Sequence, residues 1–205
     1  MHQETLTKTE VAILKFLAGN LTKSFTVREI AKSIRQDYRI TYNSIENLVN
    51  RGIVEKVKKA NINLCKISLK ADVEIFSYIE YLRALEFFNR LKEIKLIRND
   101  LLNKIPIHSF TVILFGSYVK GTYKKHSDLD LLFLIPDKRF EKEVSAAIAS
   151  IERTSPIGIH ETILTYNDFI EMLKERGRNI AKEVLEAHII FYGAEAFYKL
   201  IKATL

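Results

Sequence analysis

The chain has 205 residues, a net charge of +7 and an apolar fraction of 47%, which is ordinary for a globular protein. The length suits one large domain or two of modest size, and the positive charge suits a nucleic-acid or nucleotide partner. The single cysteine, Cys65, excludes an intrachain disulfide and favours a reducing compartment. The N-terminus is polar and no apolar run is long enough to span a bilayer, so we expect a cytoplasmic protein with no membrane partner.

Two helices with capping boxes are predicted at the start of the chain. Each begins with a threonine that is followed three residues later by a glutamate, namely Thr7-Glu10 and Thr26-Glu29. In this arrangement the threonine and glutamate side chains each accept a hydrogen bond from the other residue's backbone N–H, which fixes the start of a helix. We therefore expect helices over residues 5–18 and 26–35.

A third helix and a hairpin are predicted next. After a turn over residues 36–40, Thr41 is the expected cap of a helix that ends at Arg51-Gly52. The stretch 53–59 then alternates between apolar and charged residues, and 63–69 returns after a short turn, which predicts two antiparallel strands.

Three short helices followed by a hairpin resemble the winged helix-turn-helix domain of prokaryotic transcription regulators. The resemblance implies that the third helix enters the major groove of double-stranded DNA and that the hairpin, or wing, contacts phosphates. The residues expected at the groove or at the phosphates are Arg39, Tyr42, Asn43, Glu46, Asn50, Lys56, Lys58 and Lys59. The alternative is a winged helix that contacts another protein.

Residues 71–104 contain no glycine or proline and are predicted to form one long helix or two abutting helices. Apolar residues recur at helical spacing from Ile75 to Leu101, a stripe longer than one small domain can cover. The stripe either packs across two domains or pairs with a second copy of the chain, so a homodimer is one expectation. We expect a domain over residues 1–70, a helical connector over 71–104 and a second domain over 105–205.

Two short apolar strands are predicted around a polar loop. The run 111–115 stops at Gly116-Ser117, and ten residues later Asp128-Leu129-Asp130 opens a second run that continues to Ile135. Side chains alternate along a strand, so the two aspartates point to one face while the leucines point into the core.

Two carboxylates on one strand face repel each other unless a cation lies between them. Mg²⁺ suits this pair, because it takes one or two carboxylates and keeps positions for phosphate oxygens, and Mn²⁺ is the alternative. Gly116 permits a ligand to approach the backbone closely, and Ser117 adds a hydroxyl at a helix start that favours phosphate. The chain therefore offers a phosphate site and a metal-binding pair on neighbouring strands.

These motifs resemble those of the DNA polymerase β-like nucleotidyltransferases, above all the small prokaryotic members called minimal nucleotidyltransferases. The matching residues are Gly116-Ser117, Lys120-Gly121 and Ser127-Asp128-Leu129-Asp130, and the resemblance covers residues 105–200. It implies a mixed sheet flanked by helices, so the whole chain is expected to be an α/β (α+β) protein. It also implies that Gly116, Ser117, Lys120 and Ser127 bind a nucleoside triphosphate.

A third metal ligand is expected on a strand over residues 157–165. The family carries a carboxylate there, and this chain offers His160 and Glu161 side by side. Adjacent strand residues face opposite ways, so only one of them can join the aspartates. Carboxylate suits Mg²⁺ better than imidazole, so Glu161 is taken with Asp128 and Asp130 as the metal-binding and catalytic set. If His160 faces the site instead, the triad is incomplete.

The resemblance predicts a Mg²⁺-dependent enzyme that moves an NMP from an NTP to an acceptor and also carries a DNA-binding module. Two alternatives stay open. One is a DNA-binding regulator whose second domain is a degenerate nucleotide sensor. The other is an antitoxin-type nucleotidyltransferase that modifies a partner, which would make the acceptor a protein.

Overall fold

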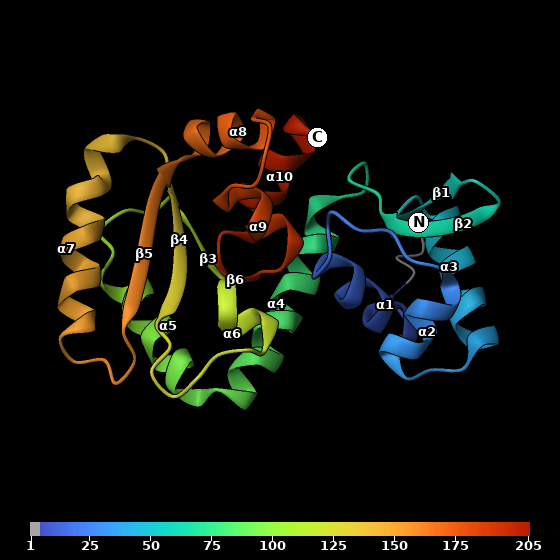
Figure 1. The fold of residues 1–205 in the computed structure, drawn as a ribbon, viewed down its shortest axis with the longest axis horizontal. Helices are drawn as coiled ribbons and strands as arrows, with labels where there is room; N and C mark the ends of the chain where they lie inside the picture. Colours follow the sequence, from blue (N-terminus) through green and yellow to red (C-terminus); the bar gives the residue numbers. More distant parts are fainter. Residues whose placement is uncertain (1–4) are drawn as a thin grey trace.

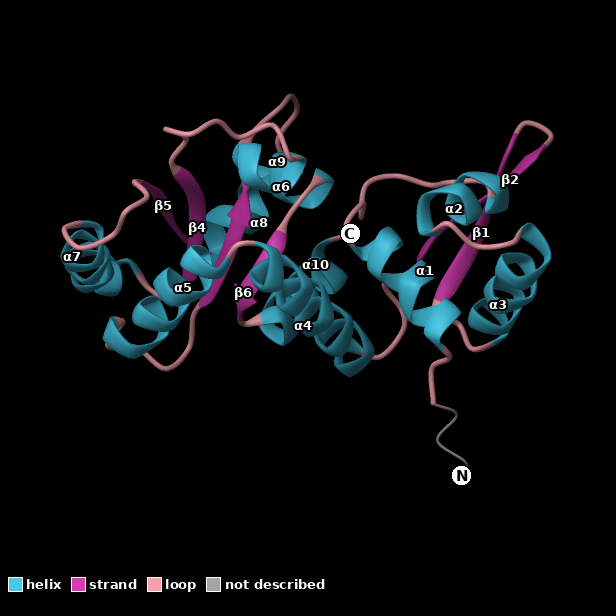
Figure 2. Cartoon of the chain, turned by 90° about the horizontal axis from the view of Figure 1, so that it is seen from below, coloured by secondary structure: helices cyan, strands magenta, loops and turns pink. Residues whose placement is uncertain are grey.

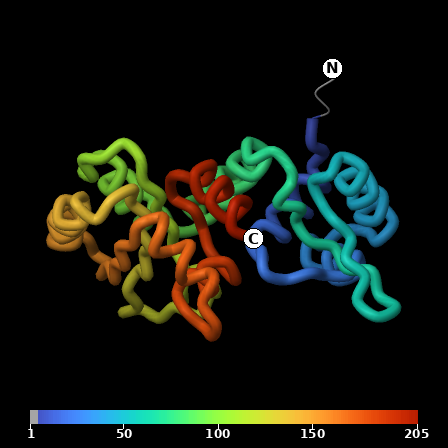
Figure 3. Tube along the Cα trace, turned by 90° about the horizontal axis from the view of Figure 1, so that it is seen from above, coloured from blue at the N-terminus to red at the C-terminus, as the bar shows by residue number. Residues whose placement is uncertain are grey.

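Figure 1 shows a computed structural model of the chain, which describes residues 5–205. A three-helix unit with a hairpin and a unit built on a four-stranded sheet are joined by one long helix, α4 (Val73–Arg90). Figure 2 shows the same division from below, and Figure 3 shows from above that the C-terminus lies next to the junction. No helix within residues 5–205 is both long and apolar enough to cross a membrane.

The first unit begins as the capping boxes predict. Its helices are α1 (Lys8–Ala18), α2 (Val27–Ile34) and α3 (Tyr38–Asn50), and its antiparallel hairpin pairs β1 (Val54–Lys59) with β2 (Ile62–Ile67). Both capping boxes are formed, at Thr7 and at Thr26. A single bridge between Phe25 and the buried Cys65 adds a third short segment beside the hairpin.

The start of α3 corrects one prediction. Asp37, and not Thr41, is the cap, because its Oδ1 atom accepts hydrogen bonds from the N–H groups of Arg39 at 2.8 Å and Ile40 at 3.2 Å. Thr41 is fully buried in the helix, where its hydroxyl donates to the Asp37 carbonyl at 2.8 Å. The helix thus begins within the expected turn, since the Asp37 carboxylate satisfies free N–H groups of its first turn.

The connector consists of two helices, α4 and α5 (Lys92–Lys104), separated by one residue. Helix α4 packs against α1 of the first unit and also against α10 (Ala194–Thr204) and β6 (Ile189–Tyr192) of the second. The apolar stripe from Ile75 to Leu101 is therefore covered within the chain over most of its length, with Leu85 exposed. The homodimer stays a prediction.

The second unit is a mixed sheet between two layers of helices. Its strands are β3 (Thr111–Phe115), β4 (Leu129–Ile135), β5 (Ile159–Thr165) and β6, in the order β5-β4-β3-β6. Strand β4 is antiparallel to β3 and parallel to β5. Helices α5 and α7 (Glu141–Glu152) cover one face, and α8 (Tyr166–Lys174), α9 (Ile180–Glu186) and α10 cover the other. Short helices α6 (Gly116–Lys120) and η1 (Lys138–Phe140) follow β3 and β4.

The expected fold class is confirmed. Helices α1, α2 and α3 followed by the β1–β2 hairpin have the order of a winged helix-turn-helix, and a mixed sheet flanked by helices follows them. The two units share a continuous apolar core, which runs from Ile13 of α1 through Phe76 of α4 to Tyr198 of α10. The Phe76 and Tyr198 rings stack with their centroids 4.8 Å apart.

A buried polar cluster, the Glu80 cluster, ties α4 to the sheet unit. The Oε1 atom of the fully buried Glu80 accepts from the Tyr198 hydroxyl at 2.9 Å and lies 3.3 Å from Nε2 of His188. Arg83 donates to both carboxylate oxygens at 2.6 Å and to the His188 carbonyl at 2.6 Å. Burial alone raises the pKa of Glu80, but the charges of Arg83 and His188 outweigh it and lower that pKa to about 2. Gly19, which caps the end of α1, lies against the same arginine, since a Cβ atom there would be 2.9 Å from its Nη2 atom.

Candidate active site

The two aspartates lie at the start of β4, each with a glycine beside it. Gly116 has a φ of +71°, and a Cβ atom there would lie 2.1 Å from Oδ2 of Asp130. A Cβ atom at Gly158 would lie 2.2 Å from Oδ1 of Asp128. Both positions therefore require glycine for the backbone to approach the carboxylates this closely. Gly158 is outside the predicted set, and its only sequence signal is a glycine near the start of the predicted strand 157–165.

The alternation of side chains predicted for this strand is present. Leu129 and Leu131 are fully buried on the face covered by α5 and α7, whereas the Asp130 side chain is 29% exposed. Within the sheet, Asp130 is paired with Phe115 of β3 and with His160 of β5. Asp130 therefore lies between the start of α6 and the neighbouring strand β5.

The strand register corrects the third predicted ligand. His160 is opposite Asp130, and its Nδ1 atom lies 3.2 Å from Oδ1 of that aspartate. Glu161 is opposite the buried Leu131, so it projects from the other face of the sheet. The prediction that Glu161 joins the aspartates is wrong, and an imidazole occupies the place expected for a third carboxylate.

Two other residues of the predicted nucleotide motif are bound to protein groups. Lys120 forms an ion pair with Glu183 of α9. The Ser127 hydroxyl accepts from the N–H group of Lys124 at 2.8 Å, and the Ser127 carbonyl accepts from the Tyr118 hydroxyl at 3.1 Å. These contacts fix the loop that connects α6 to the aspartates of β4.

The donor set fits a divalent cation that is shared with a nucleotide. Asp128 and Asp130 supply carboxylate oxygens, and Ser117 follows Gly116 in the first turn of α6. No group of three or more His, Cys, Asp or Glu side chains in residues 5–205 converges as a complete metal site. Mg²⁺ does not need one, because it is usually held by one or two carboxylates together with waters and substrate phosphates. The predicted Mg²⁺ or Mn²⁺ therefore fits this pair in the company of phosphate oxygens.

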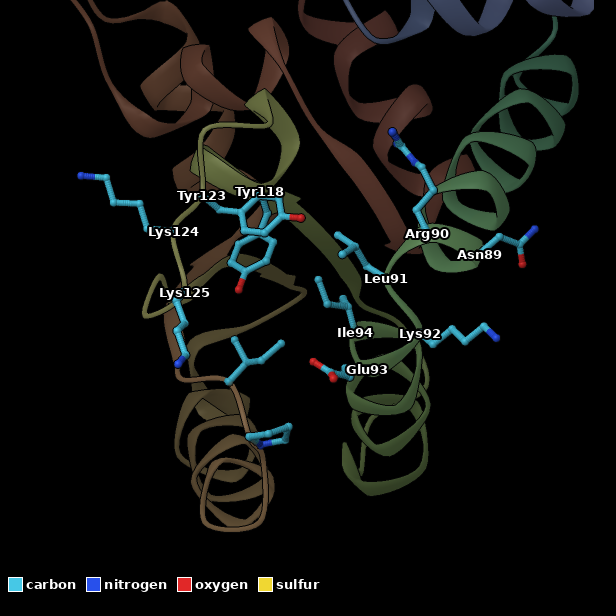
Figure 4. Close-up of a pocket in the computed structure, with 12 residues that line it drawn as sticks. Asn89, Arg90, Leu91, Lys92, Glu93, Ile94, Tyr118, Tyr123, Lys124 and Lys125 are labelled. Atoms are coloured by element: carbon cyan, nitrogen blue, oxygen red, sulfur yellow. The ribbon is translucent and has the colours of Figure 1, made fainter.

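A cavity of about 470 Å³ lies next to the loop that leads to Asp128 (Figure 4). It is lined by the junction of α4 and α5, by residues of that loop and by the segment before β5. The Tyr118 and Tyr123 rings stack in its wall, with centroids 4.4 Å and planes 7° apart. Burial raises the pKa of the Tyr118 hydroxyl, and Tyr123, Asp128 and Glu93 raise it further. None of the cavity's residues has a local sequence signal, because three separate segments form it.

The residues predicted to contact DNA lie on α3 and the wing. All but the half-buried Glu46 are exposed: Arg39, Tyr42, Asn43, Asn50, Lys56, Lys58 and Lys59. Lys56 forms an ion pair with Glu46 and lies 5.7 Å from the centre of the Tyr42 ring, which holds the wing against α3. Tyr38 is outside the predicted set, but it is 52% exposed and stacks on Tyr42 at 6.3 Å because the helix begins earlier than expected.

Comparison with known proteins bears mainly on the second unit. Residues 91–190 match the family model of the nucleotidyltransferase domain. This segment contains β3, β4 and β5 with both aspartates, so the part of the chain that carries the candidate site is similar to that domain. Among solved structures, a mutant of Lactococcus lactis ZitR is similar at 18% identity and a TM-score of 0.35. That match covers 44% of this chain and 63% of the other, less than two thirds of its length. No curated protein matches the chain.

Proposed function

We propose that the sheet unit transfers a nucleotidyl group from a nucleoside triphosphate to an acceptor. The observation that carries the proposal is the close approach of Gly116 to Asp130, inside the segment that matches the nucleotidyltransferase domain. A carboxylate beside a glycine turn allows a phosphate to contact the backbone while its cation contacts the side chain.

Each motif residue has a role in this proposal. Asp128 and Asp130 hold the divalent cation, which supplies charge stabilisation for the attacking and leaving oxygens when it is bound. The turn at Gly116-Ser117 takes the phosphates of the triphosphate. Lys120 acts through its ion pair with Glu183, which keeps α6 against α9 and so keeps the turn in position.

A second candidate function is a DNA-binding regulator whose sheet unit senses a nucleotide without turnover. The contact of His160 with Asp130 favours it, because an imidazole replaces the third acid and suits Mg²⁺ less well than a carboxylate. In this candidate the two aspartates bind the metal–nucleotide complex and no transfer follows.

We also propose that the first unit binds double-stranded DNA through α3 and the wing. The exposed Tyr38 and Tyr42 on α3 and the lysines near the hairpin tip support this, as does the net charge of +7. A homodimer would place two such units on successive half-sites of one duplex.

Titration calorimetry of the full chain with each NTP, with and without Mg²⁺, tests the proposed site. We expect a part of the binding heat of at least one NTP to require Mg²⁺, and the absence of any Mg²⁺-dependent heat for every NTP would remove both candidate functions of the sheet unit. Release of pyrophosphate in the presence of candidate acceptors then separates the transferase from the sensor, because only the transferase produces it.

A further inference from the structure

We infer that the cavity at the α4–α5 junction binds a nucleotide through its base, and that this base carries an exocyclic amino group. The inference rests on the nucleotidyl transfer proposed above and names a substrate class for that site. The cavity volume of about 470 Å³ lies in the range of small-molecule pockets.

The stacked tyrosines supply a platform for the base. Tyr118 is only 7% exposed, whereas Tyr123 keeps 41% of its surface exposed although Tyr118 covers one of its faces. A third ring can therefore continue the stack, and such base–aromatic stacking is a common source of nucleotide affinity. In Figure 4, Leu91 and Ile94 lie across the cavity from the tyrosines and give it an apolar wall.

The Glu93 carboxylate supplies the preference for an amino group. It faces the central space in Figure 4 and makes no hydrogen bond or ion pair with the rest of the described chain. A carboxylate accepts a hydrogen bond from the amino group of a base such as cytosine, and it offers nothing to the corresponding carbonyl of uracil. Glu93 also lies in the first turn of α5, where its charge suits the helix dipole, so stability must be measured alongside binding.

Four of the residues that line the cavity are cationic. Arg90, Lys92, Lys124 and Lys125 line it, and none of the four forms an ion pair within residues 5–205. The side chains of Arg90, Lys92 and Lys124 extend away from the cavity in Figure 4. They are therefore placed to meet phosphates outside the cavity while the base lies inside it.

The cavity adjoins the first aspartate of the site. Tyr118 donates to the carbonyl of Ser127, which directly precedes Asp128. Ile157 also lines the cavity and precedes Gly158, the glycine against which the Asp128 carboxylate rests. A nucleotide held here has its phosphates near that carboxylate. It is either the triphosphate itself or the terminal nucleotide of a single-stranded nucleic-acid acceptor, and both present the same base chemistry.

Titration of the full chain with CMP, AMP, UMP and ribose 5-phosphate in EDTA tests the inference. We expect CMP and AMP to bind at least about tenfold more tightly than UMP and ribose 5-phosphate. Tyr123→Ala should weaken CMP binding between about fivefold and 150-fold, whereas Tyr78→Ala, which removes an exposed tyrosine of α4 outside this cavity, should not. Glu93→Gln should bring CMP and UMP affinities together, with at most a small fall in melting temperature from the charge lost at the start of α5. Tyr123→Leu, which keeps an apolar cover over Tyr118, should behave as Tyr123→Ala does.

Two further measurements identify the source of the base and separate this inference from the proposed function. If Tyr123→Ala weakens binding of Mg²⁺–CTP, the cavity binds the base of the nucleoside triphosphate, which is the donor of the transfer. If it weakens binding of a single-stranded oligonucleotide ending in cytidine, the cavity binds the terminal base of the acceptor. Asp128→Asn should lose Mg²⁺-dependent NTP binding yet keep CMP binding in EDTA. If the proposed metal site at the aspartates is wrong, CMP binding in EDTA therefore still tests the cavity by itself. Two results would overturn the inference. One is that ribose 5-phosphate binds as tightly as CMP, and the other is that Tyr123→Ala binds every nucleotide as wild type does.

Discussion

The Nδ1 atom of His160 lies 3.2 Å from Oδ1 of Asp130, where the family pattern leads one to expect a third carboxylate. This contact gives Asp130 a partner from the neighbouring strand β5 in the absence of any cation. It also means that the chain itself offers a metal two carboxylates rather than three. Whether the sheet unit turns over its nucleotide therefore depends on how well two carboxylates and the phosphates hold the cation.

Replacing this imidazole by a carboxylate tests that dependence. His160→Asp should tighten Mg²⁺-dependent NTP binding by at least about tenfold, because a third hard oxygen ligand replaces a weaker nitrogen donor. In EDTA the same variant should melt at a lower temperature than wild type, because three like charges then face one another. Calorimetry and thermal melting measure the two effects. Glu161→Gln is the matched control, since Glu161 lies on the other face of β5 and should affect neither. Tighter binding by wild type than by His160→Asp would show that the histidine is itself the better ligand.

The wing lysines allow a test of DNA binding. A double variant, Lys58→Ala with Lys59→Ala, should weaken binding to all duplexes alike and reduce the slope of log affinity against log salt by about 2. Lys56→Ala should have a smaller effect, because Lys56 is already paired with Glu46. Gel shift or fluorescence anisotropy across a salt series measures the slope. Lys142→Ala on α7 is a control that removes one positive charge, as Lys56→Ala does, and it should not change the slope. No shift of any duplex at low salt would contradict the DNA-binding proposal.

The Glu80 cluster should contribute strongly to stability. Glu80→Gln leaves the largely buried Arg83 without its counter-charge, so we expect a loss of about 3–5 kcal/mol in the free energy of unfolding at neutral pH. Urea denaturation measures it. Glu86→Gln on the same helix is the control, since its ion pair with Lys15 is exposed and should be worth about 1 kcal/mol or less. Equal losses in the two variants would show that the cluster adds nothing.

The same cluster predicts how stability depends on pH. The folded-state pKa of Glu80 is lowered from an ordinary 4.5 to about 2. The unfolded chain therefore takes up a proton before the folded chain does, and this contribution is fully present above pH 4.5 and is lost as the pH falls toward 2. Wild type should lose stability over that window more steeply than Glu80→Gln. Parallel curves for the two proteins, from urea unfolding at a series of pH values, would exclude Glu80 as the cause.

Sequence predicted those features of the site that depend on neighbours along the chain. The glycine turn at Gly116 follows the first strand, as the motif predicts. The alternation of buried and exposed side chains around Asp130 follows from strand geometry. The choice between His160 and Glu161 could not be made in this way, because it depends on the register between β4 and β5. Helix α7 lies between these two strands in the sequence, so the register is fixed only when the sheet has formed. The paired tyrosines and Glu93 come together only when α5, the loop after α6 and the segment before β5 are folded.

The aspartate pair carries the proposal that most directly defines the function. Asp128→Asn and Asp130→Asn should each abolish Mg²⁺-dependent NTP binding, because each change removes one of the two carboxylates that the site offers to the cation and no third acid compensates for it. Neither change should unfold the domain, since both side chains lie at the open end of β4 rather than in the core. In EDTA each variant should melt at or above the wild-type temperature, because one of two repelling charges is gone.

Melting temperatures in EDTA, in Mg²⁺ alone and in Mg²⁺ with each NTP distinguish the possibilities. Wild type should gain an additional stabilisation by NTP that requires Mg²⁺, and the two variants should lose this Mg²⁺-dependent shift. Glu161→Gln should keep the full shift, because that acid lies on the opposite sheet face from Asp130. If Asp128→Asn or Asp130→Asn keeps the wild-type shift, the nucleotide binds without the carboxylate pair. Neither the transferase nor the sensor would then stand, because both place the metal–nucleotide complex on the two aspartates.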